Sequence, residues 1–251
     1  MTAKVNKFLN DSGVARWSAL VLIALMMFFA YMFVDVLSPL SSLLETSKGW
    51  SAETYGTFCS SEYFLNVFAF FLIFAGIILD KMGIRFTGIL SAAVMVIGAS
   101  IKLYAISDLF SPESALYRFL DSFWTSFPPT AKLASVGFMI FGCGVEMGGV
   151  TVSKAIAKWF KGKEMALAMG LEMAIARLGV FAVFRLSPAL STWANEQFPN
   201  VVTPVLFCTI LLIIGLMTYT IFTFMDKKLD RQLGDAAVEE SEEQFKVSDV
   251  G

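Results

Sequence analysis

The chain has 251 residues, of which 57% are hydrophobic and 16% are charged, and its formal net charge is −2. A soluble domain of this size carries more charge and shorter apolar segments. The sequence contains no histidine, which excludes histidine metal sites, histidine proton relays and Ser-His catalysis. No nucleic-acid partner is indicated, because the basic residues cluster beside apolar runs.

Several apolar segments reach the length of about 20 residues that crosses a hydrocarbon layer of about 30 Å. We predict six membrane-spanning helices, at 17–44, 55–79, 86–107, 131–158, 165–187 and 202–225. The sequence therefore predicts an all-α integral membrane protein in the lipid bilayer, with a six-helix transmembrane bundle over 17–225. Polar segments at 1–16 and 226–251 flank the bundle, and the acidic stretch 235–243 is expected to be a solvated tail.

The basic residues are distributed unequally between the two ends of these helices. One end holds Lys4, Lys7, Arg16, Lys81, Arg85, Lys158, Lys161, Lys163, Lys227, Lys228 and Arg231, and the other holds only Lys48, Lys102, Arg118 and Lys132. Because cytoplasmic loops carry the excess of Lys and Arg, we expect both termini in the cytoplasm. The expected location is a bacterial inner membrane, with a multi-pass topology.

Four polar residues interrupt the apolar runs near their middle: Asp35, Asn66, Glu146 and Arg177. Such groups are costly inside a membrane, so they are candidates for a solute site. Asp35 and Glu146 lie past the middle of the first helix of a three-helix set, while Asn66 and Arg177 lie about twelve residues into the second. Polar residues at matching depths in two sets of three helices fit a 3+3 inverted repeat.

Glu146 and Arg177 allow two interpretations. They can form a buried ion pair that only neutralises two charges, or they can face a cavity and bind the amine and the carboxylate of a zwitterion. Two further charges, Glu172 and Arg185, are expected near helix ends, where the side chain can extend to the interface. The glycines at 142, 144, 148 and 149 predict close helix packing.

A charged decamer, from Gly76 to Arg85, lies between the second and third predicted helices. Its pattern, Gly-x-x-x-Asp-Lys-x-Gly-x-Arg, comprises Gly76, Asp80, Lys81, Gly83 and Arg85. The glycines permit close helix approach and a sharp turn, and Asp80 can make a contact that is broken in another conformation. The decamer resembles the signature loop of major facilitator superfamily transporters; a simple positive-inside loop is the alternative interpretation.

Further motifs are similar to the lysosomal dipeptide-uniporter branch of that superfamily and its bacterial relatives. They are Tyr31-x-x-x-Asp35, Ser60-x-x-Tyr63-x-x-Asn66, Gly142-x-Gly144-x-Glu146, Lys158-Trp159-Phe160-Lys161-Gly162-Lys163-Glu164 and Ala176-Arg177-Leu178-Gly179. The resemblance implies alternating-access transport without a cofactor. It also implies that Glu146 and Arg177 recognise the backbone termini of a dipeptide.

The resemblance implies that the chain is half of a major-facilitator fold, ending inside the central linker. We therefore expect as partner a second six-helix half or a second copy of the chain. The alternative is a truncated membrane protein that binds a ligand or partner without transport. Uniport and proton symport both remain open, because Asp35, Glu62, Glu146 and Glu172 can titrate. We find no catalytic set and expect no enzymatic activity.

Overall fold

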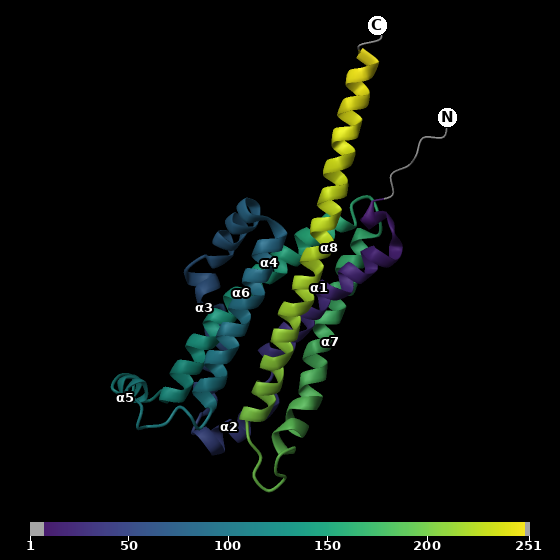
Figure 1. Cartoon of the computed structure of the whole chain (residues 1–251). Coiled ribbons are helices and arrows are strands. Elements are labelled where there is room, and N and C mark those ends of the chain that lie inside the picture. Colours follow the sequence, from purple (N-terminus) through teal and green to yellow (C-terminus); the bar gives the residue numbers. More distant parts are fainter. Residues whose placement is uncertain (1–7, 249–251) are drawn as a thin grey trace.

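The computed structural model describes residues 8–248, with the side chains of residues 8–235, and every regular element in this part is a helix. The long helices are α1 (Gly13–Val34), α3 (Ala52–Phe68), α4 (Phe71–Ile106), α6 (Pro129–Trp159), α7 (Met165–Thr192) and α8 (Val202–Ser248). The short ones are η1 (Leu9–Asp11), η2 (Ser38–Leu40), α2 (Ser41–Lys48) and α5 (Ala115–Asp121). The long helices lie side by side, α5 stands off to one side, and α8 projects beyond the bundle (Figure 1).

Within the described residues, five helical stretches are long and apolar enough to cross a membrane. They are Gly13–Lys48, Phe71–Ile106, Pro129–Trp159, Met165–Thr192 and Val202–Asp235. The prediction of an all-α, multi-pass membrane protein is therefore confirmed. The count of six spans, and with it the 3+3 repeat, stays a prediction.

The predicted second span, 55–79, is wrong as a single helix. α3 ends at Phe68, and Phe70 adopts a left-handed conformation with φ 51° and ψ 35° before α4 begins. α4 is itself interrupted at Gly83, where φ is 75° and ψ is 172°. Hydropathy gives no signal for the first break, because the residues on both sides of Phe70 are apolar and aromatic.

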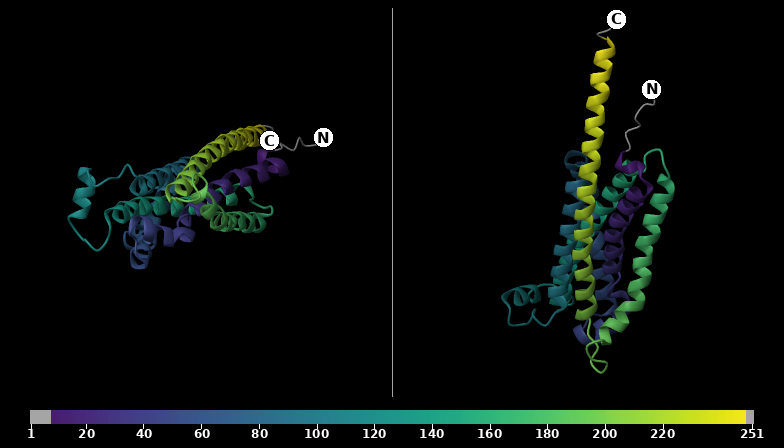
Figure 2. Two further views of the ribbon diagram at one scale, coloured as in Figure 1. Left: turned by 90° about the horizontal axis from the view of Figure 1, so that it is seen from below. Right: turned by 45° about the vertical axis from the view of Figure 1, so that its right-hand side comes forward.

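The last predicted span also differs from the structure, since α8 does not end at 225 but continues to Ser248. The residues after 225 are rich in Ala, Leu, Glu, Lys and Gln, which have high helix propensity. In the right-hand view of Figure 2, α8 runs along the bundle and then past it. Residues 249–251 of the expected tail, like Lys4 and Lys7, lie outside the described part.

Small residues allow the tightest packing, between α4 and α6. A Cβ on Gly98 would lie 2.4 Å from the backbone nitrogen of Phe141, and one on Gly144 would lie 2.9 Å from the carbonyl oxygen of Ser91. The Ser91 hydroxyl donates a hydrogen bond of 2.9 Å to the carbonyl of Gly144. The predicted packing role is thus confirmed for Gly144.

The same role holds for Gly142 and Gly148 but not for Gly149. A Cβ on Gly142 would lie 2.2 Å from the carbonyl oxygen of Glu62 on α3, and one on Gly148 would lie 2.8 Å from the Ser91 hydroxyl. A Cβ on Gly149 would have nothing within 4 Å. The three cysteines, Cys59, Cys143 and Cys208, are free, and Cys143 and Cys208 are buried.

Ion pairs join the N-terminal segment, the Gly83 turn, the end of α6, the α6–α7 loop and α8 at one end of the bundle, which we call the terminal end. They are Lys163–Asp11 (2.7 Å), Arg16–Glu164 (3.0 Å), Arg85–Asp230 (2.9 Å) and Lys158–Asp226 (2.8 Å). These basic residues all belong to the set that the sequence assigned to one side. The end of α8 at Ser248 projects from this end of the bundle in Figure 1.

Candidate functional site

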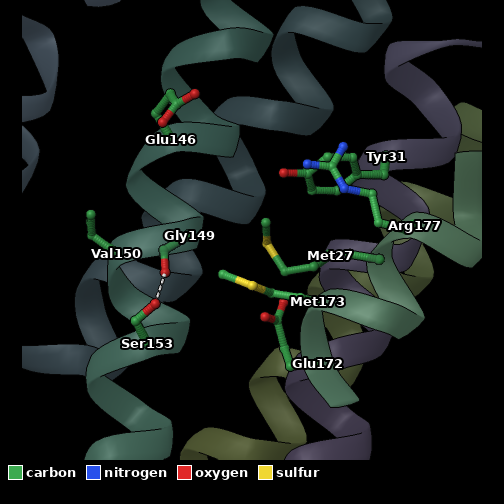
Figure 3. A pocket seen from close by; sticks show the side chains of 10 residues that line it. Met27, Tyr31, Glu146, Gly149, Val150, Ser153, Glu172, Met173 and Arg177 are labelled. Atoms are coloured by element: carbon green, nitrogen blue, oxygen red, sulfur yellow. Dashed lines mark hydrogen bonds between the residues drawn. The ribbon is translucent and has the colours of Figure 1, made fainter. Parts of the chain in front are cut away.

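A cavity of about 390 Å³ lies between α1, α6 and α7. Its wall consists of Met27 and Tyr31 from α1, Glu146, Gly149, Val150 and Ser153 from α6, and Glu172, Met173, Ala176 and Arg177 from α7 (Figure 3). The volume falls in the range of small-molecule sites, about 300–1,000 Å³. The two charges predicted from the sequence, Glu146 and Arg177, both reach this cavity.

Packing elsewhere on the helices explains why these charges face the cavity. The small residues of α6 pack on α4, so Glu146 is left on a partly exposed face. On α7, Gly179 packs on α1, since a Cβ there would lie 2.3 Å from the carbonyl oxygen of Phe28. α6 and α7 make little contact with each other, and the cavity separates them.

Glu146 and Arg177 make no ion pair with each other within the described part of the chain. The guanidinium carbon of Arg177 instead lies 5.0 Å from the ring centroid of Tyr31, within cation–π distance. Figure 3 shows these two side chains together on one wall and Glu146 on the facing wall. Glu146 and Arg177 thus line one cavity from facing walls and do not form the simple ion pair.

Glu172 lies about two turns into α7 (Met165–Thr192), toward the terminal end as predicted, but the prediction that its side chain extends to the interface is wrong. Its side chain is only 9% exposed and lines the cavity. Sequence reasoning also missed Met27, Met173 and Ser153 as lining residues. Of the residues that α1 contributes to the cavity, the sequence motifs included only Tyr31, in the pattern Tyr31-x-x-x-Asp35.

Asp35 and Asn66 do not line the cavity. Asp35, the C-cap of α1, accepts a hydrogen bond of 3.1 Å from the Ser38 hydroxyl. The amide nitrogen of Asn66 donates to the carbonyl oxygen of Glu62 at 3.4 Å, within α3. The structure thus brings Glu146 and Arg177 to one cavity and leaves the other two candidates apart.

Lys102 lies inside the bundle, whereas the sequence assigned it to the face opposite the terminal end. Its side chain is fully buried, and its Nζ lies 4.5, 5.1 and 4.3 Å from the ring centroids of Phe33, Phe58 and Phe138. Among the described residues this ammonium has no hydrogen-bond partner. The three rings, from α1, α3 and α6, form an aromatic cage that offsets part of the desolvation cost.

The glycines of the decamer differ from each other. Gly83 has a positive φ in a region that other residues rarely adopt, so it forms the sharp turn as predicted. A Cβ on Gly76 would have nothing within 4 Å, so the expected close helix approach is not found there. Lys81 is exposed and, among the described residues, makes no ion pair.

The charged residues of the decamer reach two neighbouring helices. Asp80 pairs with Lys154 of α6 at 2.6 Å. Arg85 lies 2.9 Å from Asp230 and 3.8 Å from the buried Asp226, both on α8. These contacts connect the Gly83 turn to α6 and α8 at the terminal end.

The described residues contain no group of three or more His, Cys, Asp or Glu side chains placed to hold a metal ion.

Comparison with known proteins gives one family and several partial relatives. The family described as the Major Facilitator Superfamily matches residues 23–245. The relatives include proteins from several vertebrates that carry the name lysosomal dipeptide transporter MFSD1. The Bos taurus protein is 30% identical over 107 residues, the Gallus gallus protein 38% over 65 and the Danio rerio protein 45% over 47.

These matches cover 42%, 26% and 19% of this chain, and 19%, 13% and 10% of the respective relatives. The chain thus matches about a fifth or less of the length of each of these relatives. No solved structure matches the chain.

Proposed function

The chain belongs to the major facilitator superfamily, and from this premise we propose that it transports a small zwitterionic solute, a dipeptide, by alternating access. The observation that carries the proposal is the pair of opposite charges, Glu146 and Arg177, on facing walls of one cavity. Three relatives named as dipeptide transporters, two of them more than 30% identical over short segments, support the same class of solute.

In this proposal each charge binds one end of the dipeptide. The Glu146 carboxylate accepts hydrogen bonds from the terminal ammonium, and Arg177 donates two parallel hydrogen bonds to the terminal carboxylate through its planar guanidinium. The Tyr31 ring, 5.0 Å from the guanidinium carbon, restricts the orientation of that plane. Asp35 and Asn66 are proposed to contact the solute in another state of the transport cycle.

We further propose that α3 and the first part of α4 together make a sixth, broken crossing, so that the bundle is a 3+3 half. A second six-helix half, or a second copy of the chain, would close the open side of the cavity. Rocking of the two halves around the cavity would break and re-form the contacts of Gly76, Asp80, Lys81, Gly83 and Arg85.

The proposed location is a bacterial inner membrane with both termini in the cytoplasm. Its support is the concentration of basic residues at the terminal end, together with the sequence resemblance to bacterial members of the branch. The relatives named above are described as lysosomal.

Uptake of a radiolabelled dipeptide into proteoliposomes tests this function, with the protein alone and with a co-expressed second half. We expect uptake to fall at least about tenfold in Glu146→Gln and in Arg177→Lys, since each loses a charge-assisted or bidentate contact. Glu45→Gln, at an exposed position on α2, is the matched control.

Uptake that is unchanged in both variants would refute the assignment of Glu146 and Arg177. Saturable dipeptide binding without uptake, under all conditions, would instead support a binding protein that does not transport. Comparing uptake with and without a pH gradient separates proton symport from uniport.

A further inference from the structure

The segment between α4 and α6 carries an apolar surface that the described part of the chain leaves uncovered. The segment contains α5 and connects Ile106, at the end of one membrane-spanning stretch, to Pro129, at the start of the next. It lies at the end of the bundle opposite the terminal end (Figure 1). From α5 onward, its large exposed apolar side chains are Leu116, Phe119, Phe123 and Trp124.

The order of residues along α5 separates an apolar side from a polar side. Leu116 and Phe119 are three residues apart, so they share one side of the helix. Arg118 and Asp121 lie toward the opposite side, and both are exposed. α5 is therefore amphipathic, although its apolar side does not face the core of the bundle.

Lys132 of α6 holds this segment in place. Its buried ammonium donates hydrogen bonds to the carbonyl oxygens of Leu120 and Phe123, and it lies 4.5 Å from the centroid of the Phe123 ring. Trp124, which has a left-handed φ of 45°, stacks on the buried Phe127 with 4.7 Å between ring centroids. The apolar side chains are thus exposed on a segment that is fixed to the bundle.

The direction of α5 fits contact with a membrane surface. In the right-hand view of Figure 2, α5 lies across the direction of the long helices. Because those helices cross the bilayer, an element that lies across them runs along the membrane plane. The spanning stretches of α4 and α6 begin and end beside the segment, which keeps α5 near the boundary between hydrocarbon and water.

A row of aromatic rings connects α5 to the exposed surface of α4. Tyr104 of α4 lies 5.6 Å from Phe110 between ring centroids, and Phe110 lies 5.1 Å from Tyr117 of α5. Ile97, two turns before Tyr104 on the same side of α4, is also exposed. Aromatic side chains with a polar group concentrate where membrane meets water. The surface that α4 presents to lipid therefore continues into α5.

The size of the apolar surface fits lipid better than a protein partner. Leu116, Phe119, Phe123 and Trp124 are 44%, 64%, 45% and 58% exposed. At about 200 Å² for each fully exposed side chain, they present about 400 Å² together. A stable protein interface buries about 800 Å² on each partner. α5 also stands on the side of the bundle away from α7, whereas the cavity lies between α6 and α7 (Figure 1).

We infer that α5, with Phe123 and Trp124, is an interfacial anchor for the membrane leaflet opposite the terminal end. Its apolar side chains contact the acyl chains just below the lipid headgroups, and Arg118 and Asp121 face the headgroups and water. Lys132 connects the anchor to α6. The inference does not depend on the solute that the cavity binds.

The depth of single nitroxide labels in phosphatidylcholine vesicles tests the anchor. The full chain, with its three native cysteines replaced by alanine, carries one label at Phe119→Cys, Phe123→Cys or Arg118→Cys. Collisions with oxygen, which concentrates in hydrocarbon, are compared with collisions with a water-soluble nickel chelate. Arg118→Cys is the matched control, since it lies on the polar side of the same helix, and Ile97→Cys marks the lipid-facing surface of α4.

We expect oxygen collisions to exceed nickel collisions for the labels at 119 and 123, as for the label at 97, and the reverse for the label at 118. In Phe119→Asp, the label at 123 should shift toward the nickel reagent, because a carboxylate on the apolar side resists contact with acyl chains.

Labels at 119 and 123 that nickel reaches as readily as the label at 118 would overturn the anchor. Labels shielded from both reagents would also overturn it, since a protein surface would then cover this side of α5. So would a label at 123 that keeps its depth in Phe119→Asp, because the contact would not depend on the apolar side chains. None of these outcomes affects the proposed roles of Glu146 and Arg177.

Discussion

The ammonium of Lys102 is held by the faces of three phenylalanine rings and by no anion within hydrogen-bonding distance in the described part of the chain. Cation–π contacts of this kind contribute about 2 kcal/mol or somewhat more when desolvated. The cost of burying a charge without an opposite partner is several kcal/mol. Because the cost of burying the charge exceeds the cation–π contribution, we expect an uncharged side chain of the same length to leave the protein at least as stable.

We predict that Lys102→Met keeps or raises the melting temperature of the protein in detergent. Lys102→Glu should lower the free energy of unfolding by about 3 kcal/mol or more, because an anion faces the negative ring faces without a partner. The measurement is thermal unfolding of the purified variants. A large loss of stability in Lys102→Met would mean that the aromatic cage outweighs the desolvation cost.

At the scale of single helices, Gly142 and Gly149 form a natural pair of test positions on α6. A Cβ at Gly142 would lie 2.2 Å from a backbone oxygen of α3, whereas a Cβ at Gly149 would have nothing within 4 Å. We predict that Gly142→Ala destabilises the protein by about 2 kcal/mol, because overpacking forces α3 and α6 apart.

Gly149→Ala should be neutral or more stable by up to about 1 kcal/mol, the difference in helix propensity between Gly and Ala. Thermal unfolding of the two variants side by side gives the comparison. Equal melting temperatures would show that α3 can move away from α6 without cost.

How well the sequence predicts each helix depends on which residues lie at the ends of that helix. α6 and α7 agree with the predicted spans at their terminal-end boundaries to within one residue, because charged and glycine residues separate them. The break at Phe70 lies within one apolar run, so the local conformation there depends on packing and not on hydropathy.

The candidate site was only partly predictable for a related reason. A charge in the middle of an apolar run, such as Glu146 or Arg177, is conspicuous because no interface is near. For Glu172 and Lys102 the sequence position permits both snorkelling and burial, and only the neighbouring helices decide between them. In this structure both side chains are buried.

At the scale of the whole molecule, the N-terminal segment is held on the α6–α7 loop by two ion pairs, Asp11–Lys163 and Glu164–Arg16. The hydrogen bond from Lys163 lowers the pKa of Asp11. The backbone N–H of Glu164, followed by the charge of Arg16, lowers the pKa of Glu164. Both carboxyl groups lie outside the membrane-spanning stretches.

A carboxyl group whose pKa is lowered by folding stabilises the folded contact above its unfolded pKa, about 4. The contribution is lost as the pH falls through the lower, folded pKa. We therefore predict that residues 8–16 stay attached between pH 7 and pH 5 and lose this stabilisation as the pH falls below about 4.

Hydrogen exchange of this segment, corrected for the intrinsic rate at each pH, is the measurement. Lys163→Gln should weaken the protection already at pH 7. Release of the wild-type segment near pH 6 would contradict the prediction.

The length of α8 has a mechanical consequence. Between Asp226, where the helix is tied to α6 through Lys158, and Ser248 it extends about 33 Å at 1.5 Å per residue. Over that length, a tilt of about 10° at the base corresponds to a displacement of about 6 Å at the tip. Small changes in the angles between the helices therefore become a larger movement at the end of α8. The distance between a pair of probes, one on the bundle and one at that end, would report this movement.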